Sequence, residues 1–363
     1  MKNRVKRIFD NAEKKPDAIV IKNSKEPNID NNFFYVTSLS QGLFEGSLAI
    51  LFPDGNMDLI IPKLELTSAS RSNANVKIYK NEKEFNKILK DSLKSIKNIG
   101  LNFNCISHKD FCKIKNNLTL SEFWDVSDAF EKSRIIKDEN EIELMKEAAR
   151  IADKVMKKIP DVIYEGMYEY NLAAEINYLM QKNGADKPAF NTISSFNKNS
   201  AEPHYTHGNT RLKKGDFILC DFGACFKKYN SDITRTFVFG KSDEKQREMH
   251  AVVLEAQNKG LEKIELNLEA CKVHDAVEKY INNTKFKGCF IHSTGHSLGL
   301  SVHDGDVGLN SDCDVKLKEN MIFTIEPGIY ISKFGGVRIE DDILIKKGRI
   351  ELLTKTNREL IEI

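Results

Sequence analysis

The first third of the chain alternates short apolar runs with segments whose apolar residues lie three or four positions apart. Short apolar runs predict strands, and the wider spacing predicts helices. By these rules we expect helices over residues 3–13 and 83–95, and strands over residues 18–21, 33–36, 46–52, 58–61 and 99–103. Strands that alternate with helices favour an α/β domain.

A second pattern begins after a polar and charged segment, FEKSRIIKD at residues 130–138. Beyond it we expect helices over residues 139–158, 169–183, 245–267 and 273–283, and strands over residues 217–222, 236–239, 321–325 and 336–345. A chain of 363 residues is long enough for two domains. We place the boundary near residue 130, with one domain over residues 1–130 and the other over residues 131–363.

Composition and charge narrow the classes of partner. Hydrophobic residues make up 40% of the chain and the net charge is +2, which predicts a globular protein with no nucleic-acid partner and no membrane association. The N-terminal segment has scattered charges and no apolar run behind them, unlike a signal peptide. The seven cysteines are odd in number and form no Cys-x-x-Cys pair, so we expect free thiols and a cytoplasmic location.

Two aspartates accompany the strand-like segments in the middle of the second domain. Asp221 ends an apolar run in ILCDFGA, and Asp232 starts the next strand-like segment in NSDITRTF. If these segments form a hairpin, the two carboxylates can face each other at one end of the sheet. A carboxylate in an apolar strand is destabilising unless it is paired, hydrogen-bonded or bound to metal. Asp232 taken alone is better explained as a turn or capping residue.

The segment FIHSTGHSLGLSVHD carries three of the eight histidines, His292, His296 and His303. Gly295 and Gly299 within it allow another part of the backbone to approach closely. A single histidine is more often a hydrogen-bonded polar residue than a ligand. Three histidines in one apolar, glycine-containing segment indicate a functional site instead.

Two glutamates complete the candidate site. Glu326 follows the apolar run MIFTI and precedes Pro-Gly, and Glu340 lies in the strand-like segment GVRIEDDILI. Each glutamate alone could be an ordinary acid at the edge of a sheet. Together the two Asp, two Glu and one His form an oxygen-rich set with four negative charges. Such a set suits two divalent cations, because four neighbouring carboxylates without cations would repel one another strongly.

These motifs resemble those of the pita-bread metallopeptidases, in particular the Xaa-Pro branch with prolidase and aminopeptidase P. The matching motifs are DFG at 221–223, SDITRTF at 231–237, HSTGHSLGLSVHD at 292–304, EPG at 326–328 and VRIEDD at 337–342. The first domain resembles the creatinase/prolidase N-terminal domain through FYVT at 34–37 and FPDG at 52–55. The resemblance implies an α+β fold, with a pita-bread catalytic domain preceded by an α/β N-terminal domain.

The resemblance also implies a metal centre. Two divalent ions, Mn²⁺ or Co²⁺ foremost and Zn²⁺ as a further candidate, would be held by Asp221, Asp232, His296, Glu326 and Glu340. Within this set Asp232 and Glu340 would bridge both ions, while Asp221 would bind one ion only. His296 and Glu326 would hold the other ion.

The catalytic residues implied by the resemblance are His204, His292, His303, Glu326 and Arg338. The three histidines would line the pocket, and two of them, His292 and His303, would steady the substrate and its developing oxyanion. Glu326 would also pass a proton to the leaving proline nitrogen. Arg338 would orient the neighbouring carboxylates. The implied substrates are peptides with proline in the second position, and the implied assembly is a homodimer.

The segment after His303 departs from this branch. It reads DGDVGLN, whereas many prolidases have a His-Glu-x-Pro-Arg pattern there, whose arginine is associated with the carboxylate of a dipeptide. Activity on dipeptides and activity on longer peptides therefore both stay open. A methionine aminopeptidase shares the fold and the ligands but usually lacks a first domain of this size. A non-catalytic protein-binding module or a creatinase-like hydrolase usually lacks the ligands.

Overall fold

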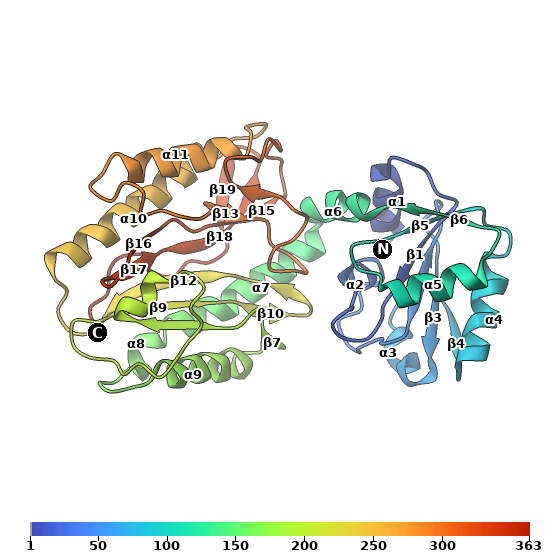
Figure 1. Ribbon diagram of the computed structural model, residues 1–363, viewed down its shortest axis with the longest axis horizontal. Helices are drawn as coiled ribbons and strands as arrows, with labels where there is room; N and C mark the ends of the chain where they lie inside the picture. Colours follow the sequence, from blue (N-terminus) through green and yellow to red (C-terminus); the bar gives the residue numbers. More distant parts are fainter. Residues whose placement is uncertain (1) are drawn as a thin grey trace. The chain divides into compact units, whose positions relative to one another are not determined.

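The computed structural model describes residues 2–363 of the chain (Figure 1). The chain separates into two compact units, Met1–Arg134 and Ile135–Ile363. Both units combine helices with strands, which confirms the expected α+β class. No helix among the described residues combines the length and the apolar composition that a membrane span needs.

The first unit is built on a mixed six-stranded sheet with the order β4-β3-β2-β1-β5-β6. Its strands are β1 (Ala18–Lys22), β2 (Leu48–Leu51), β3 (Met57–Pro62), β4 (Asn75–Tyr79), β5 (Asn98–Leu101) and β6 (Glu122–Asp125). Its helical segments are α1 (Lys2–Asn11), α2 (Asn31–Thr37), the 3-10 helix η1 (Lys63–Glu65), α3 (Leu66–Ala69), α4 (Glu82–Leu93), α5 (His108–Asn117) and α6 (Ser127–Ile135). Apolar residues of β1, β2 and β5 pack against α4 and α5 and form the core of this unit.

The strand expected over residues 33–36 is wrong, because this segment lies in helix α2. The Asp30 side chain accepts a hydrogen bond from the backbone N–H of Asn32 and starts the helix, and Ser38 ends it with a left-handed backbone, at φ 55°. Phe33 and Phe34 both pack on the ring of Phe44. Since every residue from 32 to 37 is buried, the apolar run shows no helical spacing.

The second unit contains a sheet with the order β15-β18-β12-β9-β8, and β19 pairs with β18. Its strands are β8 (Ile193–Phe196), β9 (Phe217–Phe222), β12 (Ile233–Val238), β15 (Ile322–Ile325), β18 (Glu340–Lys346) and β19 (Arg349–Leu352), and all neighbours run antiparallel. Shorter pairings involve β7 (Lys187–Pro188), β10 (Ala224–Phe226), β11 (Tyr229–Asn230), β13 (Gly295–His296), β14 (Gly308–Leu309), β16 (Gly328–Ile331) and β17 (Gly335–Arg338).

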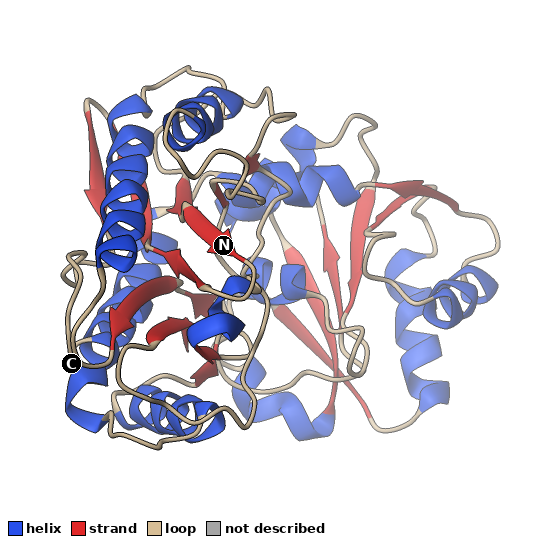
Figure 2. Cartoon of the chain, turned by 60° about the vertical axis from the view of Figure 1, so that its left-hand side comes forward, coloured by secondary structure: helices blue, strands red, loops and turns tan. Residues whose placement is uncertain are grey.

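Helices flank the strands of the second unit (Figures 1 and 2). They are α7 (Glu139–Met156), α8 (Ile159–Val162), α9 (Glu169–Lys182), the 3-10 helix η2 (Asn197–Ala201), α10 (Glu244–Lys263) and α11 (Cys271–Asn282). Helices α7 and α9 pack against β8, β9 and β12, and α10 and α11 pack against β16 and β17. The helix expected over residues 139–158 is confirmed, and a capping box formed by Asp138 and Glu141 starts it.

The strand expected over residues 336–345 is divided at Ile339. The part before it, β17, pairs with β16, and the part after it, β18, pairs with β12 and β15. The chain thus leaves one small sheet and enters the main sheet within one residue. Arg338 and Glu340 stand on either side of this change and line the same cavity.

Candidate metal centre

Asp221 and Asp232 lie on neighbouring antiparallel strands. Asp221 belongs to β9, where it is the register partner of Thr234 in β12, and Asp232 directly precedes β12. The backbone N–H of Asp232 donates to the Asp342 side chain at 3.0 Å, which fixes the start of the strand. The two carboxylates therefore line one cavity, as expected for strands paired in this way.

His296 lies in the short strand β13 beside β15 and faces the carboxylates. Its predecessor Gly295 has no room for a side chain, because a Cβ there would collide with the carbonyl group of Thr324. The Nδ1 of His296 donates to the Ser297 carbonyl at 3.2 Å, which leaves Nε2 as the unprotonated nitrogen. This Nε2 lies 3.5 Å from Glu326 Oε1 and 3.8 Å from Asp232 Oδ2. The ring therefore presents an unprotonated nitrogen to the carboxylates, the arrangement that metal binding would require.

Glu326 and Glu340 are each held by a threonine hydroxyl. Glu326 directly follows β15, and Thr324 Oγ1 donates to its Oε1 at 3.1 Å. Glu340 starts β18, and Thr234 Oγ1 donates to its Oε2 at 2.6 Å. Each hydrogen bond fixes the position of its glutamate side chain. It uses only one of the two carboxylate oxygens, so the threonine does not occupy the other.

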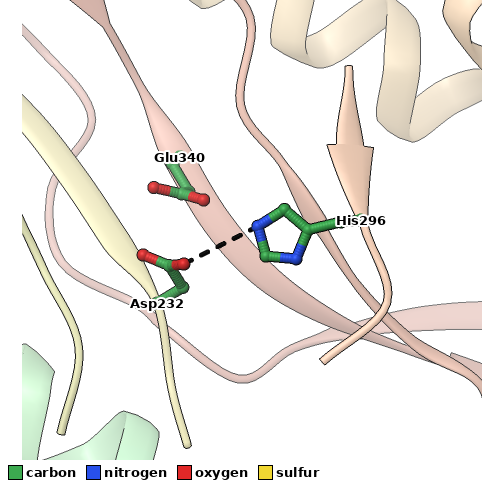
Figure 3. A group of neighbouring side chains, drawn as sticks. All are labelled: Asp232, His296 and Glu340. Carbon is green, nitrogen blue, oxygen red and sulfur yellow. Dashed lines mark ion pairs between the residues drawn. The ribbon is translucent and has the colours of Figure 1, made fainter. Parts of the chain in front are cut away.

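The side chains converge in one place (Figure 3). One ligand atom from each of Asp232, His296 and Glu340 lies within 4.8 Å of the other two. With Asp221 and Glu326 these residues line a cavity of about 290 Å³. The predicted metal-binding residues are thus brought together around one space.

Several ionised carboxylates buried together in this cavity repel one another strongly unless their charges are neutralised. Burial raises the pKa of Asp232 well above its ordinary value, and the charges of Glu340 and Asp221 raise it further. Burial likewise raises the pKa of Glu340 far above its usual range, with Glu326 and Asp221 adding to the shift. Neutralisation by protons or by bound cations relieves this repulsion.

Two buried carboxylate oxygens without hydrogen-bond partners show whether the residues fit metal ions. Among the described residues, Asp221 Oδ1 and Asp232 Oδ1 are buried and have no hydrogen-bond partner. A buried carboxylate oxygen without a partner is destabilising, and a cation in the shared cavity would coordinate it. Four carboxylates and one neutral imidazole form a donor set suited to hard or borderline divalent ions. The residues therefore fit the expected metal.

Arg338 is the buried cation of the site. Its Nη2 lies 2.5 Å from Asp221 Oδ2, its Nη1 donates to the Tyr330 hydroxyl at 2.7 Å, and its Nε donates to Thr234 Oγ1 at 3.2 Å. One guanidinium thereby connects a carboxylate of β9, a hydroxyl of β12 and a phenol of β16. Its planar fork of donors is suited to holding three groups at once.

Tyr330 is a site residue that the sequence analysis did not identify. Burial raises the pKa of its hydroxyl to about 12, so the phenol stays neutral. Nδ1 of His292 donates to the Ser293 carbonyl at 2.8 Å, so its Nε2 accepts from the Tyr330 hydroxyl, also at 2.8 Å. The ring has room because Gly336 lies opposite it in β17. The only local signal is the position of Tyr330 four residues after Glu326.

The remaining predicted histidines lie on the wall of the cavity. The His303 ring stacks on the His296 ring with centroids 4.0 Å apart, and His204 lines the same cavity. Burial lowers the pKa of His303, so a neutral ring faces the carboxylates. All predicted site residues therefore lie around one cavity.

Comparison with known proteins agrees with this geometry. The model of metallopeptidase family M24 matches residues 143–347, and that of the creatinase/prolidase N-terminal domain matches residues 4–136. The Xaa-Pro dipeptidase of Pyrococcus horikoshii is 39% identical over 363 residues, 99% of each chain.

Two solved structures extend the comparison. The prolidase from Pyrococcus horikoshii has a TM-score of 0.88 at 38% identity and matches 99% of this chain and 100% of its own. The X-Pro aminopeptidase from Thermotoga maritima has a TM-score of 0.92 at 30% identity, again over 99% of this chain and 100% of its own. This chain therefore belongs to metallopeptidase family M24.

Proposed function

We propose that this protein hydrolyses the peptide bond between an N-terminal residue and proline. The observation that carries the proposal is the convergence of four carboxylates and one imidazole on a single cavity in a chain of this family. Two of the similar proteins are named for Xaa-Pro substrates, an Xaa-Pro dipeptidase and an X-Pro aminopeptidase. A protein-binding module would have no need of this donor set.

The metal centre that we propose holds two divalent ions, Mn²⁺ or Co²⁺, with Zn²⁺ also compatible. Asp221 would bind one ion, Asp232 and Glu340 would contribute to both, and His296 and Glu326 would hold the other. The support is that two of the oxygens, on Asp221 and Asp232, are buried without a partner. When bound, such a pair of ions supplies an acidified water as nucleophile and polarises the substrate carbonyl.

The side chains of the cavity supply the remaining chemistry. Glu326, whose pKa is raised by burial, transfers a proton to the nitrogen of the leaving proline. His292 and His303 would steady the substrate and the oxygen that becomes negative, and His204 would line the pocket beside them. His292 accepts a hydrogen bond from Tyr330, which keeps the phenol directed at Arg338. Arg338 in turn holds the Asp221 carboxylate in place.

A second cavity favours peptides longer than two residues. It measures about 410 Å³ and shares Ser293, His296 and His303 with the cavity of the metal centre. Its lining includes three exposed aspartates, Asp306, Asp312 and Asp314, and no lysine or arginine among the described residues; a fourth, Asp304, is buried and paired with Lys137. The free carboxylate of a dipeptide would be repelled by this lining, whereas a longer peptide places its carboxylate further away.

A substrate panel tests this proposal. Protein loaded with Mn²⁺ or Co²⁺ is offered Xaa-Pro dipeptides, Xaa-Pro-Yaa tripeptides, the same tripeptides with alanine in place of proline, and Met-Ala-Ser. We expect cleavage only where proline is second, with tripeptides preferred to dipeptides by about tenfold or more in kcat/KM. Cleavage of Met-Ala-Ser alone would support a methionine aminopeptidase, and no cleavage with no bound metal would support a binding module.

We also propose a homodimer in a reducing compartment, the cytoplasm. All seven cysteines are free thiols, which supports the compartment. The resemblance of the sequence to the Xaa-Pro branch supports the dimer. The first unit would act as a creatinase/prolidase-like domain and the second as the catalytic domain, with the boundary near residue 130.

A further inference from the structure

A separate cavity lies in the first unit, which contains none of the proposed metal ligands. It measures about 530 Å³ and is lined by parts of β1, β4, α4 and α5. Tyr79 and Phe85 form an aromatic wall, with their rings edge to face and their centroids 5.2 Å apart. A cavity of this size with an aromatic wall and an otherwise mainly polar lining can hold a small molecule that carries a charged group.

Lys22 at the end of β1 provides a cation to this cavity. Its Nζ donates to the carbonyl oxygens of Gly46 at 2.5 Å and Ser47 at 3.3 Å, and it lies 5.2 Å from the centroid of the Phe85 ring. Among the described residues, no carboxylate forms an ion pair with it. Burial lowers the pKa of Lys22 to about 8, and Asp110 offsets this only in part. The ammonium therefore has Asp110 nearby as a partial counter-charge but no ion pair of its own with any described residue.

Two of the three acids in the lining, Asp110 and Glu82, have partners of their own, and the third, Glu26, is exposed. Asp110 accepts hydrogen bonds from the Ser24 hydroxyl at 2.6 Å and the Ser107 hydroxyl at 2.7 Å. Glu82 forms an ion pair with Lys113 at 2.9 Å. Two further lysines of the lining, Lys25 and Lys109, are exposed at its rim. The lining as a whole carries four lysines against three acids, so its formal charge is positive by one.

We propose that this cavity binds a small organic anion, a carboxylate or phosphate joined to an aromatic or apolar body, with Lys22 as its charge partner. The anionic group takes up the remaining hydrogen-bonding capacity of the ammonium, which has three donors and uses two on carbonyls. The apolar body lies against the Tyr79–Phe85 wall. This site is independent of the metal centre, and its test does not depend on peptidase activity.

Binding to the intact protein tests the proposal, with benzoate and phenyl phosphate as the two anionic probes and benzyl alcohol as the neutral one. We expect one or both anions to bind at least about tenfold more tightly than benzyl alcohol by calorimetry. Lys22→Met should weaken anion binding at least about tenfold, and Lys22→Arg should retain most of it. Lys94→Met, which removes an exposed lysine outside the cavity, should bind as the wild type does.

A second measurement locates the ligand without any variant. Wild-type protein is labelled with a limiting amount of an amine-reactive reagent, and the extent of labelling at Lys22 is read by peptide mapping. The anionic probe should protect Lys22 at least about fivefold and leave Lys94 unchanged, which also separates this site from anion binding at the metal centre. Equal affinity of wild type and Lys22→Met, no binding of either anion, or no protection of Lys22 would each overturn the proposal.

Discussion

Asp232→Asn is expected to remove both divalent-metal binding and Xaa-Pro hydrolysis. Asparagine has nearly the same shape but cannot carry the negative charge that a bridging ligand needs. We expect kcat/KM to fall at least about 1,000-fold, equivalent to about 4 kcal/mol of transition-state stabilisation. Metal content by mass spectrometry and kcat/KM on an Xaa-Pro substrate measure the two effects.

The same substitution should stabilise the metal-free protein against thermal unfolding. Burial and the charges of Glu340 and Asp221 raise the pKa of Asp232, so its carboxylate destabilises the chelator-treated fold. Metal-free Asp232→Asn should therefore have a higher Tm than the metal-free wild type. The matched control is Asp306→Asn, which replaces an exposed aspartate outside the proposed ligand set and should leave metal content and Tm unchanged. Full activity in Asp232→Asn would show that the bridging carboxylate is misassigned.

Arg338→Met is expected to have the second-largest effect. The substitution keeps an unbranched apolar stem but leaves the Asp221 carboxylate buried without its cation and the Tyr330 hydroxyl without its donor. Removing one partner of a buried ion pair costs about 3–5 kcal/mol of unfolding free energy. We also expect kcat/KM to fall about 100-fold, because Asp221 is no longer held in place. Denaturant unfolding and steady-state kinetics measure the two losses.

Two further variants show whether the geometry of the Arg338 guanidinium matters beyond its positive charge. Arg338→Lys keeps the charge but cannot reach Asp221, Thr234 and Tyr330 together, so we expect only partial recovery. Arg358→Met removes an arginine of the same unit that contacts Gln257 and Asn258 of α10 and should keep full activity. If Arg338→Met retained wild-type kcat/KM and metal affinity, Arg338 would have no positioning role.

The parts of the fold that the sequence predicts well are those whose pattern is local. The helix α7 has apolar residues at helical spacing and a capping box, and β9 is largely a short apolar run. Residues 33–36 could not be assigned in this way, because all sides of α2 are buried and an apolar run then fits a strand equally well. Tertiary packing against Phe44 and the cap at Asp30 decide the outcome.

The candidate site likewise has features that the sequence predicts and features that it does not. The family and the clustering of the predicted ligands follow from motifs, since each ligand lies within one of the quoted sequence segments. Tyr330 could not be found from its own segment, because its contacts with Arg338 and His292 arise only when β16 and β17 pair. The division of residues 336–345 between two sheets is likewise a consequence of pairing. The individual roles of the site residues stay predictions.

The central claim is that two ions held by one donor set support Xaa-Pro hydrolysis, and a metal titration tests it most directly. Chelator-treated protein is titrated with Mn²⁺ while bound metal and Ala-Pro-Ala turnover are measured on the same samples. The account predicts no turnover without metal, saturation of binding at two ions per chain, and maximal turnover only near that point. Full turnover in the metal-free protein, or saturation with no turnover of any Xaa-Pro peptide, would contradict it.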